Sequence, residues 1–281
     1  MPRFLIILFV LFKSGASFAQ QNDLHAAVFN VGISSVGSGF GALINKKPNE
    51  KGGRVFLRGM WQGAIGGILV FNSKQMIYEF GQTDNSGWAW SSKLVNAAGV
   101  SIIENAAANK KFLTHWHINF GFNRIEFETE KSFKVNYKVM PFALNGFIYS
   151  LRNGSFDFKE TIRIGQPFFW AQTLEVPDAD AVTAANSILM IKNKANSRNT
   201  AHEIVHTYQY QGLTVKNTYY SIPFNRLLSK ENWFAKTYKK WIYTDFNYLI
   251  FSGAYALGNF GNYLDNPFEQ EANYYSWKFE Q

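Results

Sequence analysis

Residues 115–139 read HWHINFGFNRIEFETEKSFKVNYKV and alternate between apolar and polar side chains. Successive side chains of a β-strand point to opposite faces of a sheet, so this alternation predicts strands with one buried face and one wet face. The same period continues over residues 147–149 and 156–158, and Asn153-Gly154 between them is a hairpin-turn signal. We therefore expect an antiparallel meander of four or five strands.

The segment before these strands has a helical pattern. A first helix is predicted over residues 55–80 and a second over 88–108, with a turn at 81–87 between them. Both helices have a face of small residues, and the first repeats glycine at every fourth position: Gly59, Gly63 and Gly67. Small faces let two helices approach closely, so we expect a tightly packed helical hairpin. A membrane hairpin would use the same spacing, but the apolar part of the first helix covers only residues 64–71, which favours a soluble hairpin.

The other segments complete a predicted α+β fold. Residues 20–53 are rich in Gly, Ser, Asn and Lys, which indicates an irregular or weakly stranded start. Residues 178–190 predict a helical, Ala-rich connection, and residues 227–251 a largely buried aromatic helix. A last short helix is predicted over 262–281, starting at Asn266-Pro267. The C-terminal region is therefore expected to be helical.

Residues 1–19 have the features of a secretory signal peptide. Arg3 precedes an unbroken apolar run over residues 4–12, and small residues at Ser17 and Ala19 form a cleavage site. The apolar run is too short to span a bilayer, and no cysteine follows it for attachment of a lipid. We expect an exported protein that is periplasmic, outer-membrane-associated or secreted, with no transmembrane segment after cleavage. The absence of cysteine favours a bacterial envelope.

The chain that remains after cleavage is expected to divide near residue 175. Residues 20–175 would hold the helical hairpin and the antiparallel sheet, and residues 176–281 the C-terminal helical region. The alternative is one continuous domain, because the length allows either arrangement.

The composition is typical of a folded soluble chain and excludes several kinds of chemistry. Of 281 residues, 47% are hydrophobic and 17% are charged. The net charge is +8 and falls to +6 when Arg3 and Lys13 leave with the signal peptide. Its basic residues are scattered, which excludes a nucleic-acid-binding surface. The lack of cysteine removes thiolate ligands and cysteine nucleophiles.

Residues 202–206 read His-Glu-Ile-Val-His and form the motif with the clearest chemistry. Positions four apart on a helix lie one turn above each other, so His202 and His206 can hold one cation between them. Glu203 is rotated by about 100° from His202, which places its carboxylate beside the cation as a base for water and not as a ligand. Imidazole nitrogen suits zinc, which keeps one position open when a third protein group completes its ligands.

Residues 201–209, AHEIVHTYQ, resemble the active-site helix of the HExxH metallopeptidases, the zincins. In the glutamate-zincin branch, the third zinc ligand is a glutamate on a later helix, followed after two residues by Ala and Asp. Residues 269–273, EQEAN, are similar, and the register of the family makes Glu269 the third ligand. Glu271 is the competing ligand. Asn273 stands where the family has Asp, a departure at the position that supports a ligand histidine.

Four further residues are candidates for contacts with a substrate or a metal ligand. Gln209 is three residues after His206 and shares the metal-facing side of the helix. Tyr210 is one of several nearby tyrosines that could stabilise an oxyanion, because zincins use Tyr or His for that role. His115 and His117 share one face of a predicted strand and could form a second metal site or polarise a substrate carbonyl. Polar residues at the start of a strand are the alternative interpretation.

The resemblance implies an exported zinc-dependent hydrolase of the metallopeptidase type, with a peptide or protein as substrate. His202, His206 and Glu269 would bind zinc, and Glu203 would activate water and pass the proton toward the leaving amine. Two alternatives stay open: a catalytically weak, zincin-like envelope binding protein, and a small outer-membrane β protein in which the histidines are incidental.

Overall fold

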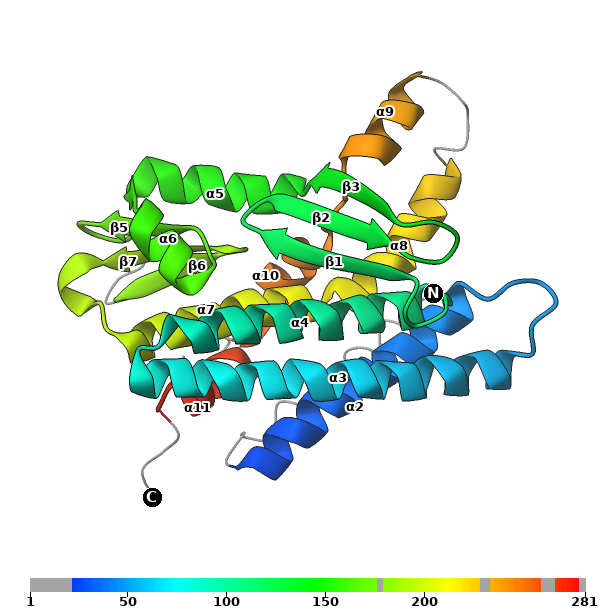
Figure 1. Ribbon diagram of the computed structural model, residues 1–281, viewed down its shortest axis with the longest axis horizontal. Helices are drawn as coiled ribbons and strands as arrows, with labels where there is room; N and C mark the ends of the chain where they lie inside the picture. The colour runs from blue at the N-terminus through cyan, green and yellow to red at the C-terminus, as the bar shows by residue number, and fades with distance from the viewer. Residues whose placement is uncertain (1–21, 176–178, 228–232, 259–265, 278–281) are drawn as a thin grey trace.

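The computed structural model describes residues 22–175, 179–227, 233–258 and 266–277, and it has the predicted α+β fold (Figure 1). The predicted signal peptide, residues 1–19, lies outside the described residues. The elements up to the second sheet are α2 (Asp23–Ile44), α3 (Gly52–Thr83), α4 (Ser86–Ala107), β1 (His115–Phe120), β2 (Asn123–Glu128), β3 (Lys134–Val139) and α5 (Pro141–Asn153). The second sheet and its connections are β4 (Ser155–Phe156), α6 (Phe158–Ile164), β5 (Phe168–Ala171), β6 (Ala181–Ala184), β7 (Ser187–Ile191) and a short 3-10 turn, η1 (Lys192–Lys194). The remaining helices are α7 (Ser197–Gly212), α8 (Thr214–Leu227), α9 (Trp233–Trp241), α10 (Asn247–Gly258) and α11 (Pro267–Trp277).

The predicted helical hairpin is confirmed as α3 and α4. The turn between them places Asp84 in the left-handed region, with φ of 54°, and the side chain of Asn85 accepts a hydrogen bond from the backbone N–H of Gly87 at 2.8 Å. The close approach of the two helices rests on Gly66 and Gly99. A Cβ on either of them would lie 2.7 Å from the carbonyl oxygen of the other, which is nearer than real Cβ contacts come.

The start of the described chain is helix α2, so the prediction of an irregular segment over residues 20–53 is wrong there. Small and polar side chains form the buried face of α2, among them Asn30, Ser34 and Ser38, and these hide its helical period. The glycine stripe of α3 packs against this face. A Cβ on Gly59 would lie 2.7 Å from the carbonyl oxygen of Ser38, and one on Gly63 would lie 2.5 Å from that of Ser34. The stripe therefore serves the contact with α2, and not the contact with α4.

This packing predicts that Gly63→Ala destabilises the protein. The added methyl group would meet the Ser34 carbonyl oxygen and the Ser38 hydroxyl, both at 2.5 Å, and forcing the helices apart costs roughly 1–3 kcal/mol. The matched control is Gly32→Ala on α2, where nothing lies within 4 Å of the added carbon. There the better helix propensity of alanine should stabilise by up to about 1 kcal/mol. Urea unfolding measures both variants, and an unchanged stability of Gly63→Ala would contradict the close packing.

The antiparallel meander has three strands, in the order β1-β2-β3, where four or five were predicted (Figure 1). The strand predicted at residues 147–149 is wrong, because these residues lie in α5. Pro141 occupies the start of this helix, and its buried residues recur at helical spacing: Ala143, Gly146 and Ser150. Asn153 ends the helix, so Asn153-Gly154 is a helix end and not a hairpin turn. Of the predicted strand at 156–158, Phe156 lies in β4 and Phe158 begins α6.

A second sheet has the order β4-β5-β7-β6, with β5 and β7 parallel and the other pairs antiparallel. Its strands β6 and β7 occupy part of residues 178–190, where a helical connection was predicted, so that prediction is wrong. The turn between them contains Ala185, whose φ of 56° is left-handed. Strand β7 is almost wholly buried, and a short buried strand has no alternation that separates it from a buried helix.

The aromatic helix predicted over residues 227–251 is broken into separate helices, and residues 228–232 within it lie outside the described residues. Its aromatic side chains on α9 are exposed and not buried: Trp233 is 78% exposed and Phe234 is 58% exposed. The last helix, α11, starts at Pro267 as predicted, and the side chain of Asn266 accepts a hydrogen bond from the backbone N–H of Phe268 at 3.0 Å.

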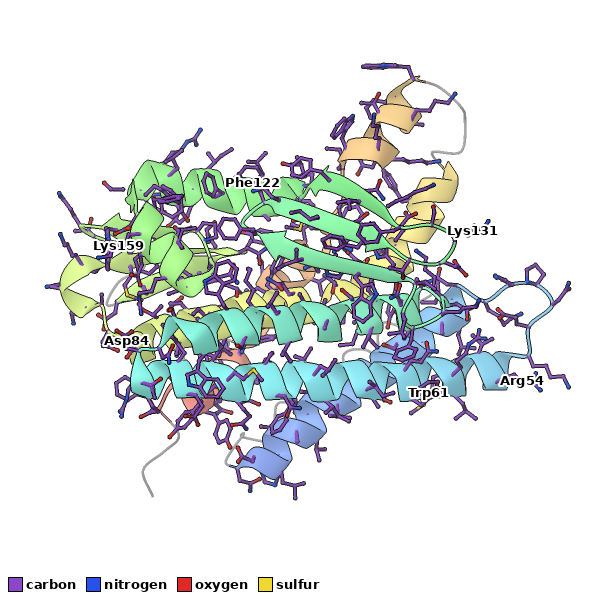
Figure 2. All side chains as sticks on the ribbon, viewed as in Figure 1. Arg54, Trp61, Asp84, Phe122, Lys131 and Lys159 are labelled. Atoms are coloured by element: carbon purple, nitrogen blue, oxygen red, sulfur yellow. The ribbon has the colours of Figure 1, made fainter. Side chains whose placement is uncertain are left out.

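One hydrophobic core contains residues from both sides of residue 175. It joins α3, α4, β5, β7, α7 and α11 through side chains that include Ile77, Phe80, Phe168, Ile188, Tyr208 and Tyr275. Helix α7 crosses this core, and sticks fill the space between it and α4 (Figure 2). A helix held on several sides in this way fixes the side chains that it carries.

Candidate metal centre

Helix α7 carries the His-Glu-Ile-Val-His motif and is anchored at its start. The side chain of Asn196 accepts a hydrogen bond from the backbone N–H of Asn199 at 2.8 Å, which caps the helix. Ile204, Val205 and Tyr208 pack into the core, so the helix cannot rotate about its axis without exposing them. The opposite side of the motif is then presented toward α10 and α11.

Three ligand atoms converge at this side: Nε2 of His202, Nε2 of His206 and the carboxylate of Glu269 on α11. The two imidazole nitrogens are 3.0 Å apart. His202 Nε2 lies 3.2 Å from Glu269 Oε2, and His206 Nε2 lies 3.2 Å from Glu269 Oε1. All three groups offer atoms within 4.8 Å of one another, and they form the one group of this kind among the described residues.

The donor set fits a divalent metal ion. Glu269 is 1% exposed, and both of its carboxylate oxygens face imidazole nitrogens at 3.2 Å, so this buried carboxylate calls for a cation. Two imidazole nitrogens that face each other share one proton at most, whereas both of their lone pairs can bind one metal ion. His202 has 15% of its side chain exposed, which leaves an approach from solvent. The residues present can therefore hold a metal ion with two nitrogen ligands and one carboxylate.

Charge within the site is arranged to favour cations. Burial raises the pKa of Glu269, but the two histidines outweigh it and hold this pKa well below its usual range. Burial lowers the pKa of His206, but the hydrogen bond and charge of Glu269 outweigh it and raise this pKa to about 9. A proton and a metal ion thus compete for His206 Nε2.

Glu203 lies beside the ligand group but outside it. It is 6% exposed, and its Oε2 accepts a hydrogen bond from the hydroxyl of Thr183 on β6 at 2.6 Å. The hydroxyl of Thr183, a neutral donor, thus holds Oε2 of Glu203, and Oε1 can accept a proton. This is the placement that the motif predicts for a base. Sequence reasoning missed Thr183, because its strand was predicted to be helical.

A buried chain of hydrogen bonds supports His206 from behind. Gln209 donates from Nε2 to Glu271 Oε2 at 3.0 Å, so its Oε1 is the acceptor for His206 Nδ1 at 2.8 Å. His206 then carries its proton on Nδ1 and turns the lone pair of Nε2 toward His202 and Glu269. Gln209 therefore contacts His206, one member of the candidate metal cluster.

Glu271 belongs to this chain of hydrogen bonds, whereas Glu269 belongs to the group that could hold a metal ion. Its Oε1 pairs with Lys74 Nζ of α3 at 2.6 Å and accepts a hydrogen bond from Asn30 of α2 at 3.0 Å. Burial raises the pKa of Glu271, but Lys74 and the hydrogen bonds outweigh it and hold it below its usual range. Gln209, backed by Glu271, is thus the group that supports His206 in this structure.

Tyr255 of α10 also reaches the site, and sequence reasoning missed it. Its hydroxyl donates to Glu269 Oε1 at 2.5 Å, and its ring meets that of His206 edge-on with centroids 6.2 Å apart. No local pattern marks this residue, since it is one of 14 tyrosines. Tyr210, which was predicted to contact substrate, is turned away: its hydroxyl donates to Asp245 Oδ2 at 2.8 Å, in the core.

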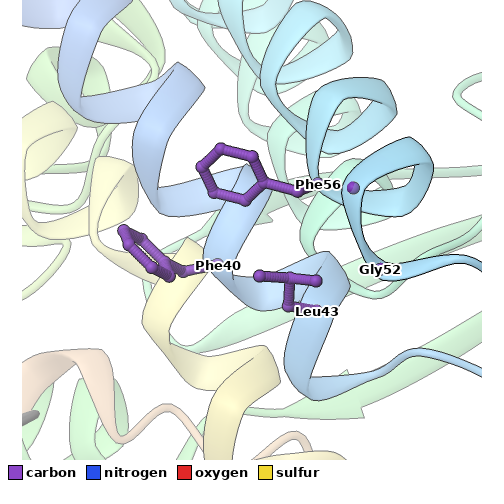
Figure 3. A pocket seen from close by; sticks show the side chains of 5 residues that line it. Phe40, Leu43, Gly52 and Phe56 are labelled. Carbon is purple, nitrogen blue, oxygen red and sulfur yellow. The ribbon is translucent and has the colours of Figure 1, made fainter.

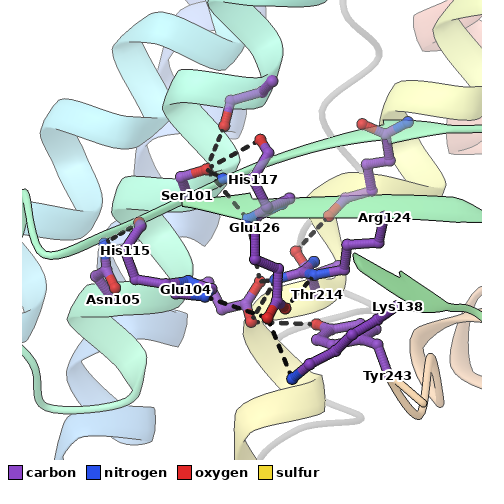
Figure 4. A network of polar contacts seen from close by, with 12 residues as sticks. Ser101, Glu104, Asn105, His115, His117, Arg124, Glu126, Lys138, Thr214 and Tyr243 are labelled. Atoms are coloured by element: carbon purple, nitrogen blue, oxygen red, sulfur yellow. Dashed lines mark hydrogen bonds and ion pairs between the residues drawn. The ribbon is translucent and has the colours of Figure 1, made fainter. Parts of the chain in front are cut away.

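His115 and His117 belong to a separate polar network on β1, β2 and α4 (Figure 4). His115 Nε2 lies 3.5 Å from Glu126 Oε2, and His117 Nδ1 lies 3.7 Å from Glu104 Oε2. Two cations balance this network: the buried Arg124 pairs with Glu104 at 3.0 Å and with Glu126 at 2.7 Å, and Lys138 pairs with Glu126 at 3.1 Å. Burial lowers the pKa of His117 to about 3. The predicted second metal site is therefore not formed, and the network holds the first sheet on α4.

Comparison of the chain with family models, with curated proteins and with solved structures finds no match.

Proposed function

We propose that this protein is an exported zinc-dependent hydrolase of the metallopeptidase type. The observation that carries the proposal is the convergence of His202, His206 and Glu269 on one point, with the carboxylate of Glu203 outside this group and held by Thr183. Two imidazoles and one carboxylate are a ligand set typical of catalytic zinc sites, which keep one further position for water or substrate. A structural zinc site has no use for a neighbouring base.

Each of these residues has a separate role in the proposed reaction. His202, His206 and Glu269 hold the metal, and the hydrogen bond from His206 to Gln209 fixes the imidazole that Glu269 contacts. Zinc, when bound, would polarise a substrate carbonyl and acidify water beside it. Glu203 takes the proton from the attacking water and delivers it to the leaving amine. Thr183 holds the carboxylate of Glu203 in place for both transfers.

The position of β6 supports an extended peptide as the substrate. This strand lies at the end of the second sheet and contacts α7 through the bond from Thr183 to Glu203. A peptide that adds to the edge of a sheet presents its backbone carbonyls at regular spacing along that edge. The base and the edge are fixed relative to each other, so a carbonyl bound at the edge would be held near the base.

Export is the compartment that we propose for this activity, on the basis of residues 1–19. The lack of cysteine fits a protein that relies on its core for stability and not on disulfides.

Removal of the metal tests the proposed activity. We expect the purified mature protein to cleave members of a mixed peptide library, and a chelator to abolish cleavage. One equivalent of zinc should restore it, because the ligand residues stay in place on two packed helices. Mass spectrometry of the products measures both steps. Cleavage that survives complete removal of metal would contradict the proposal.

The competition at His206 predicts that zinc affinity depends on pH. Below a pKa of about 9 the imidazole binds a proton that zinc must displace. The apparent affinity should therefore rise by about tenfold per pH unit from pH 6 to pH 8 and level off above pH 9. Competition with a chromophoric chelator, corrected for the protonation of the chelator, measures this slope. A flat profile would contradict the assignment of His206 as a ligand.

A further inference from the structure

Helix α2 exposes large apolar side chains in its first half and at its last residue. Residues 26–45 contain no charged side chain, and four large apolar residues of the helix are well exposed: Leu24, Val28, Ile33 and Ile44. Of the described helices, α2 is the one that is long and apolar enough to cross a membrane, and only 28% of its most apolar stretch is buried. A soluble protein rarely exposes a large apolar patch without a partner for it.

An apolar hollow continues this face where α2 turns into α3 (Figure 3). It has a volume of about 340 Å³ and is lined by Phe40, Leu43, Gly52, Gly53 and Phe56. Leu57, which follows this group on α3, is 64% exposed. We call the exposed side chains of residues 24–44 and the adjoining hollow the α2 surface.

Basic residues gather at the edge of the α2 surface. Four basic residues lie just after α2: Lys46, which is half-buried, and Lys47, Lys51 and Arg54, which are exposed. The one acidic residue among them, Glu50, is bound by Arg58 at 2.9 Å and by the Asn109 amide at 2.6 Å. The edge therefore presents four positive charges that no neighbouring carboxylate of this segment balances.

The inner face of α2 is fixed to the rest of the protein by buried polar bonds. Asn30 donates to Glu271 at 3.0 Å and accepts from Lys74 Nζ at 2.8 Å, and the glycine stripe of α3 packs against Ser34 and Ser38. Crossing a bilayer would break these bonds and leave a buried ion pair incomplete, which is costly. The helix can meet a membrane only by lying along its surface.

We propose that the α2 surface docks on a membrane with anionic headgroups, with α2 in the plane of the interface and the four basic residues against the headgroups. An apolar helix face next to a basic cluster is the combination that binds such membranes. A second copy of the chain is the other occupant that the test below distinguishes.

Flotation of the mature protein with lipid vesicles tests this proposal. We expect binding to phosphatidylcholine vesicles that contain about 30% phosphatidylglycerol, weakened by salt, and little binding to phosphatidylcholine alone. The triple variant Lys47→Glu, Lys51→Glu, Arg54→Glu should bind at least about a hundredfold more weakly, since each charge near a membrane changes affinity by about fivefold. Alkaline carbonate should release the bound protein.

A matched triple variant keeps the net charge equal but changes a distant surface: Arg152→Glu, Lys159→Glu, Lys192→Glu. These residues are exposed, and Lys159 lies at the opposite end of the molecule from Arg54 (Figure 2). This control triple variant should bind vesicles like wild type. The variant Val28→Asp, at a residue that is 62% exposed, should bind vesicles more weakly while its unfolding midpoint stays unchanged. Equal loss in both triple variants, or no binding by wild type, would overturn the proposal. So would release by detergent alone, or a dimer in solution that Val28→Asp dissociates.

Discussion

We expect the Glu203→Gln variant to keep its zinc and to lose peptide hydrolysis by a factor of about 10²–10⁴. Glutamine preserves the shape of the side chain and can still accept the hydrogen bond from Thr183. It cannot accept a proton, so water is no longer activated and the leaving amine is no longer protonated. Because Glu203 lies outside the ligand group, the metal should stay. The measurements are kcat on a cleaved peptide and zinc content.

The control for this variant is Thr183→Val, which removes the donor to Glu203 and keeps the base. We expect a loss of about fivefold in kcat, because one neutral hydrogen bond contributes roughly 1 kcal/mol. Full activity in Glu203→Gln would show that another group moves the proton.

The second large effect is expected from Lys74→Met. Lys74 and Glu271 are 3% and 2% exposed and pair at 2.6 Å, so removal of the cation leaves a buried carboxylate without its partner. Breaking a buried pair from one side costs about 3–5 kcal/mol. Urea unfolding should show this loss. The exposed pair of Lys111 and Glu130 supplies the control, because Lys111→Met should change stability by less than about 0.5 kcal/mol.

The double variant Lys74→Met, Glu271→Gln should recover most of the stability that Lys74→Met loses, because no charge is then left unpaired. The pH dependence gives a second readout. A pKa of Glu271 held below its ordinary value of 4.5 stabilises the folded wild type above pH 4.5, and this contribution is lost as the pH falls. The stability of the double variant should not show this contribution of Glu271 to the pH dependence. A stability of Lys74→Met equal to wild type would contradict the buried pair.

The helices and strands that could be predicted are those in which apolar residues recur with the period of a helix or a strand. The alternation in 115–139 marks β1 to β3, and the turn at 81–87 separates α3 from α4. Helix α2 was hidden because its buried face is made of Asn30, Ser34 and Ser38, which look like a loop in sequence. The glycines of α3 did signal a close helix contact, but a stripe of small residues does not say which helix fills it.

The candidate site was predictable in the part that lies on one helix. His202, Glu203 and His206 follow from spacing along α7, and Glu269 followed from the register of the zincin pattern. The residues that complete the site come from distant segments. Lys74 lies 197 residues before Glu271, and only the tertiary packing of α3 on α11 brings them together. Thr183 and Tyr255 are likewise placed by packing, and no local pattern marks them.

The zinc content of the mature protein, measured by elemental analysis after supply of zinc at neutral pH, tests the metal centre most directly. We predict about one zinc per chain in wild type and in Glu203→Gln, and its loss in His202→Ala and in Glu269→Ala. Glu271→Gln should retain the metal, because Glu271 pairs with Lys74 and does not reach the ligand group. Wild-type protein that binds no zinc, or a Glu269→Ala variant that binds it as tightly as wild type, would contradict this account.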